Sequence, residues 1–344
     1  MVVYPHGIFD PKADSPLSDE ELRNKKDRYE SFKADIEIDR ITRSVFGADA
    51  SSVKVFGNTT NALDHLVYEV HVQGQPALVY RIATGSTPAH HLATEEHLYA
   101  LWRTRGIPVP EVFATHIRDR EFSYDWMVME KVGTESLEQH LHNNPADDEY
   151  YAREAGRYLA AIHRIELPGF GHLSLAPDGN KLAGSESSWS AAVYIRLEDT
   201  IDYLISCGIV GDRVADEIRN AFRRNADALV LERGMSLHGD YHDANIIIDS
   251  GMRTVAAAVD LSQAKAGDPV FDIAFYSTYY SPEKLGRFLE GYRSVTPTPP
   301  DAERRISLYA LRIHLSKAKL RKRFGYDERI PAARAGIERA LRVL

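Results

Sequence analysis

Most strand-like segments of this chain lie in one stretch, and this limits the folds available to it. Short apolar runs separated by turn residues occupy Ser52 to Glu130, whereas the pattern after Gly133 is mainly helical. Within the first stretch the order is three strands, one helix and two further strands. This order predicts a small antiparallel sheet that carries one helix, followed by a larger helical part, which is an α+β fold.

Each element is expected from its own pattern and its flanking turn residues. In the sheet region the predicted strands are 53–55, 67–72, 77–83, 112–116 and 126–130, and the predicted helix is 92–102. Ahead of them we expect an irregular arm over 1–17 and helices over 18–32 and 36–46, the second ending at Gly47. After Gly133 we expect helices over 152–165, 191–207, 214–231 and most of 270–344, a loop over 177–188, a short strand near 236–237, and a hairpin with arms 246–249 and 255–259.

The length of the chain predicts more than one packed body. A chain of 344 residues exceeds what one ordinary hydrophobic core organises, so two lobes are expected. We predict a first lobe over 51–133 and a second lobe over 134–344, preceded by an N-terminal arm and helices over 1–50.

Charge and cysteine content exclude several classes of function. The 42 Lys and Arg residues against 50 Asp and Glu residues give a formal net charge of −8, which argues against nucleic acid as a partner. The single cysteine, Cys207, excludes an internal disulfide and a multi-cysteine zinc site. No apolar run approaches the roughly 18 residues of a membrane span, and residues 1–12 show no secretory signal pattern. We therefore expect a cytoplasmic protein that does not bind membranes; its oligomeric state stays open.

The most informative motif is His238-Gly-Asp-Tyr-His-Asp-Ala-Asn245, which Asp260 follows after the predicted hairpin. Phosphoryl transfer needs a carboxylate to orient and deprotonate the attacking hydroxyl, and oxygen ligands for a magnesium ion that bridges the nucleotide phosphates. The spacing places Asp240 and Asn245 on one loop, and the hairpin returns Asp260 to the same side. We therefore predict Asp240 as the catalytic base and Asn245 and Asp260 as ligands of Mg²⁺.

The two histidines of this motif allow a different interpretation. His238 and His242 are four residues apart, which is the spacing of a zinc pair on a helix. Gly239 and the hairpin that follows argue against a helix at this place, so the zinc interpretation is the weaker one.

With these residues the chain resembles the aminoglycoside phosphotransferase family, which is similar in fold to protein kinases and includes choline, homoserine and methylthioribose kinases. The resemblance rests on the motif just described, on Val259-Asp260 and on Gly267-Asp-Pro-Val-Phe-Asp-Ile-Ala274, and it extends from about Val53 to Tyr280. It implies a two-lobed protein-kinase-like fold, with a small antiparallel sheet in the N-lobe and a mainly helical C-lobe. It gives Asp240, Asn245 and Asp260 the roles already predicted from their spacing. It also implies supporting roles for His238, Asp268 and Asp272, of which Asp272 steadies the catalytic loop from the next helix.

The expected nucleotide-binding residues depart from the kinase pattern. There is no Gly-x-Gly-x-x-Gly, so the turn Asn58, Thr59, Thr60 and Asn61 is expected near the phosphates. Arg81 stands on the third strand where a kinase has lysine, and its acidic partner is Glu95 or Glu96. Glu95 is preferred because Leu98, Tyr99 and Trp102 then follow at +3, +4 and +7 on the helix. The backbone groups of Glu130, Lys131 and Val132 are expected at the purine, and such contacts do not separate ATP from GTP.

The expected function is an ATP- or GTP-dependent O-phosphotransferase that uses Mg²⁺ and acts on a hydroxyl of a small polar molecule. An aminoglycoside-like or other antibiotic is the first candidate for the acceptor, which would make the protein an antibiotic-resistance enzyme. A metabolite kinase of the choline, homoserine or sugar type is the alternative. A non-catalytic nucleotide-binding protein is the candidate from another class, and the presence of Asp240, Asn245 and Asp260 counts against it.

Two charged clusters each allow more than one interpretation. The acids Glu198, Asp199 and Asp202 lie on a predicted helix and are candidates to attract an amino-bearing acceptor, although exposed helix charges look the same. The basic run of Lys317, Lys319, Arg321, Lys322 and Arg323 is better explained as a solvated helix face than as a surface for nucleic acid.

Overall fold

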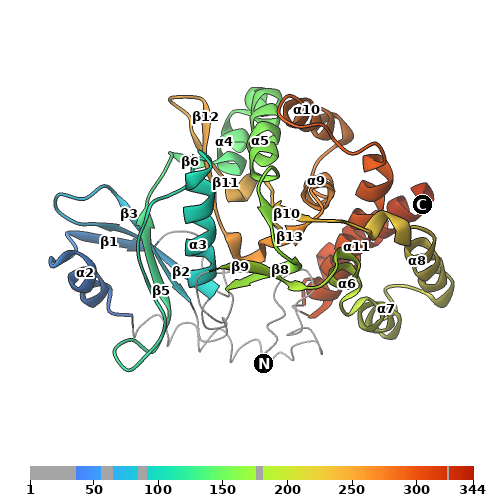
Figure 1. Cartoon of the computed structure of the whole chain (residues 1–344), viewed down its shortest axis with the longest axis horizontal. Coiled ribbons are helices and arrows are strands. Elements are labelled where there is room, and N and C mark those ends of the chain that lie inside the picture. Colours follow the sequence, from blue (N-terminus) through green and yellow to red (C-terminus); the bar gives the residue numbers. More distant parts are fainter. Residues whose placement is uncertain (1–35, 56–64, 84–90, 176–180, 324) are drawn as a thin grey trace. The chain divides into compact units, whose positions relative to one another are not determined.

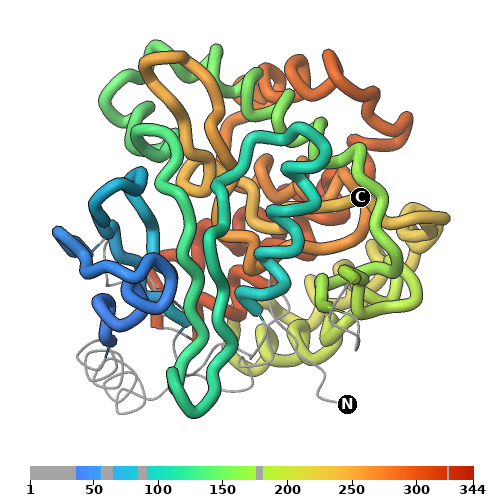
Figure 2. Tube along the Cα trace, turned by 60° about the vertical axis from the view of Figure 1, so that its left-hand side comes forward, coloured from blue at the N-terminus to red at the C-terminus, as the bar shows by residue number. Residues whose placement is uncertain are grey.

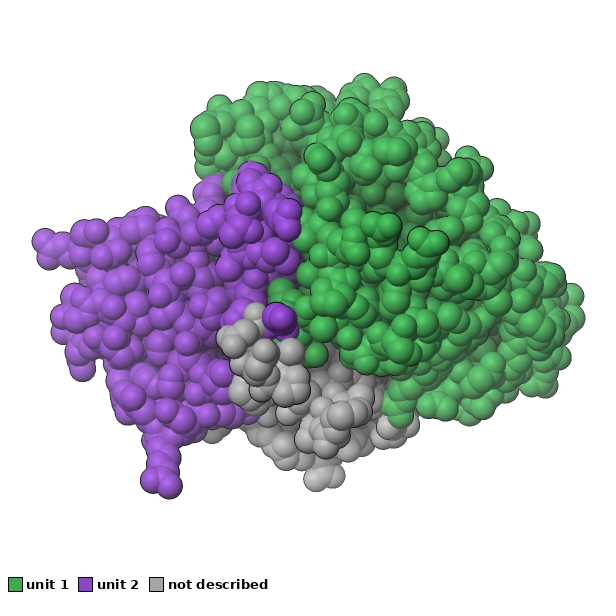
Figure 3. All heavy atoms as spheres, in the orientation of Figure 1, with its two compact units in different colours: residues 1–17, 134–176, 182–344 green, residues 18–133, 177–181 purple. Residues whose placement is uncertain are grey.

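The computed structural model describes residues 36–55, 65–83, 91–175, 181–323 and 325–344. The chain forms two compact units that adjoin in sequence at Gly133 and Thr134 (Figure 3). The sheet unit is Ser18–Gly133 with Pro177–Lys181, and the helical unit is Met1–Leu17 with Thr134–Ala176 and Leu182–Leu344.

The sheet unit contains the antiparallel sheet that the sequence predicts (Figure 1). Its five strands stand in the order β1-β2-β3-β5-β4. The β4–β5 hairpin extends along the sheet with α3 beside it (Figure 2). The elements of this unit are α2 (Ile38–Phe46), β1 (Ser52–Val55), β2 (His65–His71), β3 (Leu78–Ala83), α3 (His91–Thr104), β4 (Val112–His116) and β5 (Trp126–Glu130).

The two faces of this sheet are covered by different helices. Leu78, Tyr80 and Ile82 are fully buried in a core that includes residues of α2, and the Tyr80 hydroxyl lies 3.1 Å from Thr42 Oγ1 of that helix. Alternation along β3 turns Arg81 to the opposite face, where it meets α3. Helix α2 ends at Gly47, as predicted, but it belongs to the packing of the sheet and not to a separate N-terminal segment.

The helical unit is mainly helical, as predicted, and is built around α11. Buried apolar residues of α6, α7, α8, α9, α11 and α12 form one continuous core. None of the described helices is long and apolar enough to cross a membrane. The helices are α4 (Leu137–Asn143), α5 (Asp148–Ile162), α6 (Trp189–Tyr194), α7 (Leu197–Ser206), α8 (Asp212–Arg224), α9 (Val270–Ser277), α10 (Pro282–Arg293), α11 (Ala302–Arg323) and α12 (Ile330–Val343).

This unit also contains a sheet of which the sequence predicted only the short strand near 236–237. Its five short strands pair in the order β7-β10-β13-β8-β9. The prediction of a loop over 177–188 is wrong for its second half, because β9 pairs with β8 there. The two strands approach closely at Gly184 of β9, where an added Cβ would meet the backbone of Phe170 at 2.3 Å. The strands are β7 (Glu166–Leu167), β8 (Phe170–Leu175), β9 (Leu182–Glu186), β10 (Gly234–Leu237) and β13 (Lys265–Gly267).

The helix predicted over 191–207 is broken in the structure. Helix α6 ends at Tyr194 and α7 begins at Leu197, with Arg196 between them at φ 51°. The buried guanidinium of Arg312, on α11, donates to the carbonyls of Val193 (3.0 Å) and Ile195 (2.9 Å). A buried donor thus satisfies two carbonyls that a continuous helix would have bonded internally.

The predicted hairpin is confirmed and belongs to a three-stranded sheet. β11 (Ile246–Asp249) pairs with β12 (Thr254–Ala258) on one side and with β6 (Glu135–Ser136) on the other. The loop His238–Asn245 therefore connects β10 of one sheet to β11 of another, and Asp260 stands just beyond β12. Both ends of the loop are fixed by strands, which limits how far its side chains can move.

Candidate active site

The loop that carries Asp240 begins with a glycine that no other residue can replace without strain. Gly239 has φ 82°, and a Cβ at this position would meet the carbonyl oxygen of Gln263 at 1.8 Å. The close approach of the two backbone segments brings the loop against the residues that follow Asp260. Any side chain at 239 would push these segments apart.

Asp272 holds the start of this loop from the first turn of α9. Its carboxylate accepts the backbone N–H groups of His238 (2.7 Å) and Gly239 (2.9 Å) and bonds to His163 Nε2 (3.1 Å). Burial alone would raise the pKa of Asp272, but the hydrogen bond and charge of His163 and the amide donors hold this pKa below its ordinary value. An ionised carboxylate with these donors keeps the loop in one position.

His238 connects the loop to the end of β12. Its Nε2 lies 3.0 Å from the carbonyl oxygen of Val259, and its Nδ1 accepts the backbone N–H of Asp240 (3.3 Å). This pattern assigns the proton to Nε2. Burial lowers the pKa of His238, which keeps the ring neutral at pH 7. Because both ring nitrogens are engaged with backbone groups, neither remains for a metal shared with His242.

The structure brings Asp240, Asn245 and Asp260 together. Asn245 Nδ2 donates to the Asp240 carbonyl (3.0 Å) and to Asp240 Oδ2 (3.1 Å). The backbone N–H of Val259, the neighbour of Asp260, donates to the carbonyl of Asn245 (2.9 Å). His242 Nε2 lies 3.6 Å from the other carboxylate oxygen of Asp240.

The chemistry of this group fits a hard cation. Because Asn245 Nδ2 is engaged with Asp240, the amide atom that remains for a ligand is Oδ1. Amide and carboxylate oxygens are the donors that Mg²⁺ prefers. Asp260 stands at φ 62°, a conformation that is sparsely populated by residues other than glycine and that is concentrated at functional sites.

Asp268 lies in a different network from the catalytic loop. It accepts the Tyr309 hydroxyl (2.7 Å) and Arg305 Nη1 (3.1 Å) from α11, and it caps α9 through the Val270 N–H (3.0 Å). These contacts of Asp268 join α9 to α11. The structure does not bring it to Asp240, unlike His238 and Asp272.

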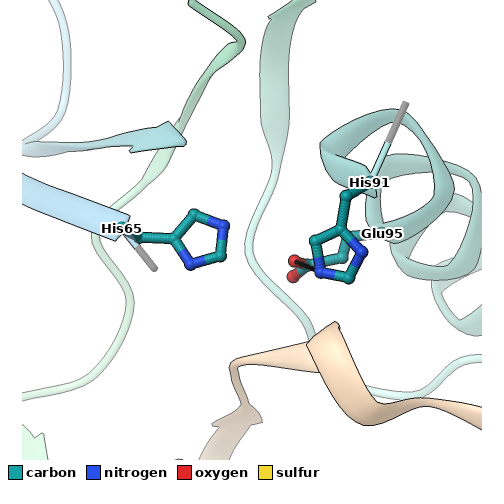
Figure 4. Close-up of side chains that lie close together, drawn as sticks. All are labelled: His65, His91 and Glu95. Carbon is teal, nitrogen blue, oxygen red and sulfur yellow. Dashed lines mark ion pairs between the residues drawn. The ribbon is translucent and has the colours of Figure 1, made fainter. Parts of the chain in front are cut away.

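In the sheet unit, the structure pairs Arg81 with Glu95, the acid that the sequence favoured over Glu96. Both side chains are buried. His91 Nε2 lies 3.4 Å from the other Glu95 oxygen, and His65 faces this group from the end of β2 (Figure 4). Ligand atoms of His65, His91 and Glu95 lie within 4.8 Å of one another, but the Glu95 carboxylate is already paired with the Arg81 guanidinium. The predicted phosphate-binding residues Asn58, Thr59, Thr60 and Asn61 lie outside the described residues.

The predicted purine-binding segment is only partly available. The N–H of Glu130 donates to the Glu111 carbonyl (2.7 Å), and the N–H of Lys131 donates to the Ala77 carbonyl (2.8 Å). The Lys131 ammonium pairs with Glu69 (2.9 Å). Among the described residues, no backbone acceptor is bonded to the N–H of Val132, which makes it the amide of this segment best able to meet a ligand.

The acids proposed for an amino-bearing acceptor are already paired on the surface. Arg219 binds Glu198 (2.8 Å) and Asp202 (3.0 Å), and Arg196 binds Asp199 (3.2 Å). All three carboxylates are largely exposed to solvent. Their contacts within the described chain are with arginines and not with the catalytic loop.

The basic run on α11 is not a solvated face, and the prediction was wrong on this point. Lys319 and Arg323 are buried, and Lys317 is half-buried, because α11 is packed on several sides by other helices. The Lys317 ammonium lies 2.8 Å from Thr278 Oγ1 and 3.6 Å from the ring centroid of Tyr279, both just beyond α9. Lys317 is more than fifty residues from the motif and outside the family resemblance, so the sequence held no signal for this neighbourhood.

Comparison with known proteins places most of the chain in one family. The model of the phosphotransferase enzyme family matches residues 60–305, which is more than two thirds of the chain. The matched span contains Arg81, Glu95 and the whole segment from His238 to Asp272.

Solved structures of similar fold include several phosphotransferases. A thermostable mutant of the aminoglycoside phosphotransferase APH(4)-Ia, in ternary complex with ADP and hygromycin B, is 16% identical with a TM-score of 0.66, covering 89% of this chain and 98% of that one. A protein of Thermobifida fusca assigned as a fructosamine-3-kinase is 20% identical with a TM-score of 0.63, covering 88% and 99%. The macrolide 2'-phosphotransferase MphH from Brachybacterium faecium is 16% identical with a TM-score of 0.58, covering 86% and 96%. At these identities the similarity shows the fold alone, which is the kinase-like fold that the sequence predicted.

Proposed function

The chain belongs to the phosphotransferase enzyme family, and from this premise we propose that it transfers the γ-phosphoryl group of ATP to a hydroxyl of a small polar molecule. It is a phosphotransferase with an alcohol group as acceptor. The observation that carries the proposal is the group formed by Asp240, Asn245 and Asp260, in which one amide bonds the carboxylate that would act as base.

Asp240 would orient the acceptor hydroxyl and take its proton. Asn245 bonds one of its carboxylate oxygens, and His242 lies near the other. A carboxylate whose position is fixed in this way can hold a hydroxyl in line with the phosphorus atom, which is most of what phosphoryl transfer asks of a protein.

Asn245 and Asp260 would hold a magnesium ion. When bound, the ion supplies positive charge that neutralises the nucleotide phosphate oxygens. Asn245 would bind it through Oδ1 while its Nδ2 stays with Asp240. One side chain thus relates the position of the base to that of the metal site.

Arg81 and Val132 would contribute to the binding of the nucleotide. The Glu95 carboxylate fixes the Arg81 guanidinium, which would offer its positive charge to phosphate oxygens. The N–H of Val132 would donate to the purine ring of the nucleotide, and the turn 58–61 would lie near the phosphates. ATP is proposed as donor because structures of similar fold bind ADP or AMP-PNP. Use of ATP suits an enzyme of the cytoplasm.

A metabolite is favoured over an aminoglycoside as the acceptor. An aminoglycoside carries several ammonium groups and needs carboxylates to bind them. The acids that the sequence offered for this purpose, Glu198, Asp199 and Asp202, are already neutralised by arginines.

A phosphorylation screen tests the proposed function. Purified full-length protein is incubated with Mg²⁺ and either ATP or GTP against a panel of antibiotics and hydroxyl-bearing metabolites, and product is detected by mass spectrometry. We expect a phosphorylated product with ATP that disappears in Asp240→Ala. Product that forms equally in wild type and Asp240→Ala, or the absence of any product across the panel, would overturn the proposal.

A further inference from the structure

The Lys317 ammonium is held at a fixed place by the end of α9. Thr278 Oγ1 accepts one of its N–H groups at 2.8 Å. The ring centroids of Tyr279 and Phe275 lie 3.6 and 4.6 Å from Nζ, so two aromatic faces border the cation. Cation–π contacts of this kind keep a charge in position without neutralising it.

A continuous series of contacts leads from Lys317 to the predicted base. The Tyr279 ring stacks on His242, with centroids 4.7 Å apart and planes 17° apart. His242 Nε2 in turn lies 3.6 Å from Asp240 Oδ1. The ammonium therefore lies two aromatic rings away from the carboxylate that would take the acceptor proton. A ligand can reach this series of contacts at Tyr279, because that residue is 46% exposed.

The charge of Lys317 is not balanced within the described chain. Nearby Lys284, on α10, pairs with Asp148 and with Asp243 at 2.6 Å, whereas none of the described carboxylates lies within 4.0 Å of the Lys317 ammonium. Arg321, one helical turn further along α11, donates to the carbonyl of Arg329 and likewise has no described carboxylate partner. A half-buried ammonium with spare N–H donors is costly unless an anion joins it.

The pKa of Lys317 agrees with this description. Burial lowers it, the negative charge of Asp240 raises it and the positive charge of Arg321 lowers it, and the pKa that results is about 7. A bound anion would stabilise the charged form.

We propose that Lys317 and Tyr279 form an acceptor subsite that binds an anionic group of the substrate, so that the acceptor is a hydroxyl compound bearing a carboxylate or a phosphate. Lys317 is then a specificity-determining residue that favours anionic acceptors and repels polyamines. The proposal rests on the proposed function, because it takes Asp240 as the base that the acceptor hydroxyl approaches.

The kinetic test compares four classes of acceptor: hydroxy acids, phosphorylated alcohols, neutral polyols and amino sugars. Wild type, Lys317→Met and Lys317→Arg are compared with Lys322→Met, a control on the same helix whose ammonium pairs with Asp327. We expect the highest kcat/KM with an anionic class. Lys317→Met should raise the acceptor KM about tenfold or more, with partial recovery in Lys317→Arg and no effect in Lys322→Met. The two anionic classes distinguish a carboxylate from a phosphate.

A binding measurement keeps the proposal testable without turnover. Thermal shift of the full chain with each probe should show stabilisation by an anionic class that Lys317→Met loses, while all variants still bind ATP as wild type does. An equal loss for neutral and anionic acceptors, a weakened affinity for ATP, or binding of anions that does not depend on Lys317 would reject the subsite. If Asp240→Ala leaves turnover intact, the proposed function fails; if that variant is inactive and Lys317 has no charge-selective effect, only the subsite fails.

Discussion

At the scale of single residues, Asp240 is the group whose loss should matter most to turnover. Asp240→Ala removes the carboxylate that would accept the hydroxyl proton, and positioned general bases contribute roughly 10²–10⁴-fold. We expect kcat to fall by that factor with little change in affinity for the nucleotide, measured by steady-state kinetics and calorimetric titration. Asp212→Ala, which changes an exposed aspartate in the first turn of α8, is the control and should retain wild-type turnover. A variant of Asp240 that keeps more than about a tenth of kcat contradicts the assignment.

Arg81 should matter to binding of the nucleotide. Arg81→Met removes the guanidinium but keeps much of its stem, and affinity for a non-hydrolysable ATP analogue should fall by about 1.5–3 kcal/mol, the range for hydrogen bonds to charged groups. Arg81→Lys should recover part of this, because an ammonium cannot reproduce a forked contact. Calorimetric titration measures both, with the exposed Arg105→Met as control. Equal affinities in all four proteins would show that Arg81 only supports the sheet unit.

The sequence could predict the residues that one motif holds together. Asp240, Asn245 and Asp260 are placed by a single loop and its hairpin, so their spacing along the chain carries over directly into space. Lys317 reaches the same neighbourhood through the packing of α11 against α9, which depends on the whole helical unit. No local pattern of charges distinguishes such a lysine from one in solvent.

At the scale of elements, the crossing of α5 and α10 depends on two glycines. A Cβ at Gly291 would meet the Arg153 carbonyl oxygen at 1.9 Å, and one at Gly156 would meet the Phe288 carbonyl oxygen at 2.0 Å. Gly291→Ala should therefore force the helices apart and lower the free energy of unfolding by about 1–3 kcal/mol. Gly286→Ala, on the same helix with open space around it, should raise it by roughly 0.5–1 kcal/mol. Urea denaturation followed by circular dichroism measures both, and equal effects would disprove the close crossing.

Elements were predictable where their pattern was strong and local. The strands of the sheet unit have alternating or continuous apolar residues bounded by turns, and all five were recovered. β7, β9 and β13 are two to five residues long and owe their existence to pairing partners far along the chain. The break between α6 and α7 depends on Arg312, more than a hundred residues away, so no window of the sequence contains it.

At the scale of the whole molecule, bound nucleotide should stabilise the folded chain. A ligand that binds only the folded state, present at about a hundred times its Kd, raises the free energy of unfolding by about 2.7 kcal/mol. We expect ATP with Mg²⁺ to raise Tm more than ATP with a chelator does. In Asp260→Asn this difference should shrink, because the substitution removes a negative charge from the metal ligands. Differential scanning calorimetry measures these Tm values, and Asp249→Asn in the same hairpin is the control. If Asp260→Asn shows the same effect of Mg²⁺ on Tm as wild type, Asp260 is not a metal ligand.

The two ends of helix α9 support different parts of the proposed site. Its first turn holds Asp272 beneath the catalytic loop, and the residues after its last turn, Thr278 and Tyr279, hold Lys317. Substitutions at the far end can therefore change which compounds are accepted while the first turn keeps the chemistry intact. After a gene duplication, one copy could therefore acquire a new acceptor specificity through substitutions at this end while it keeps the same catalytic residues.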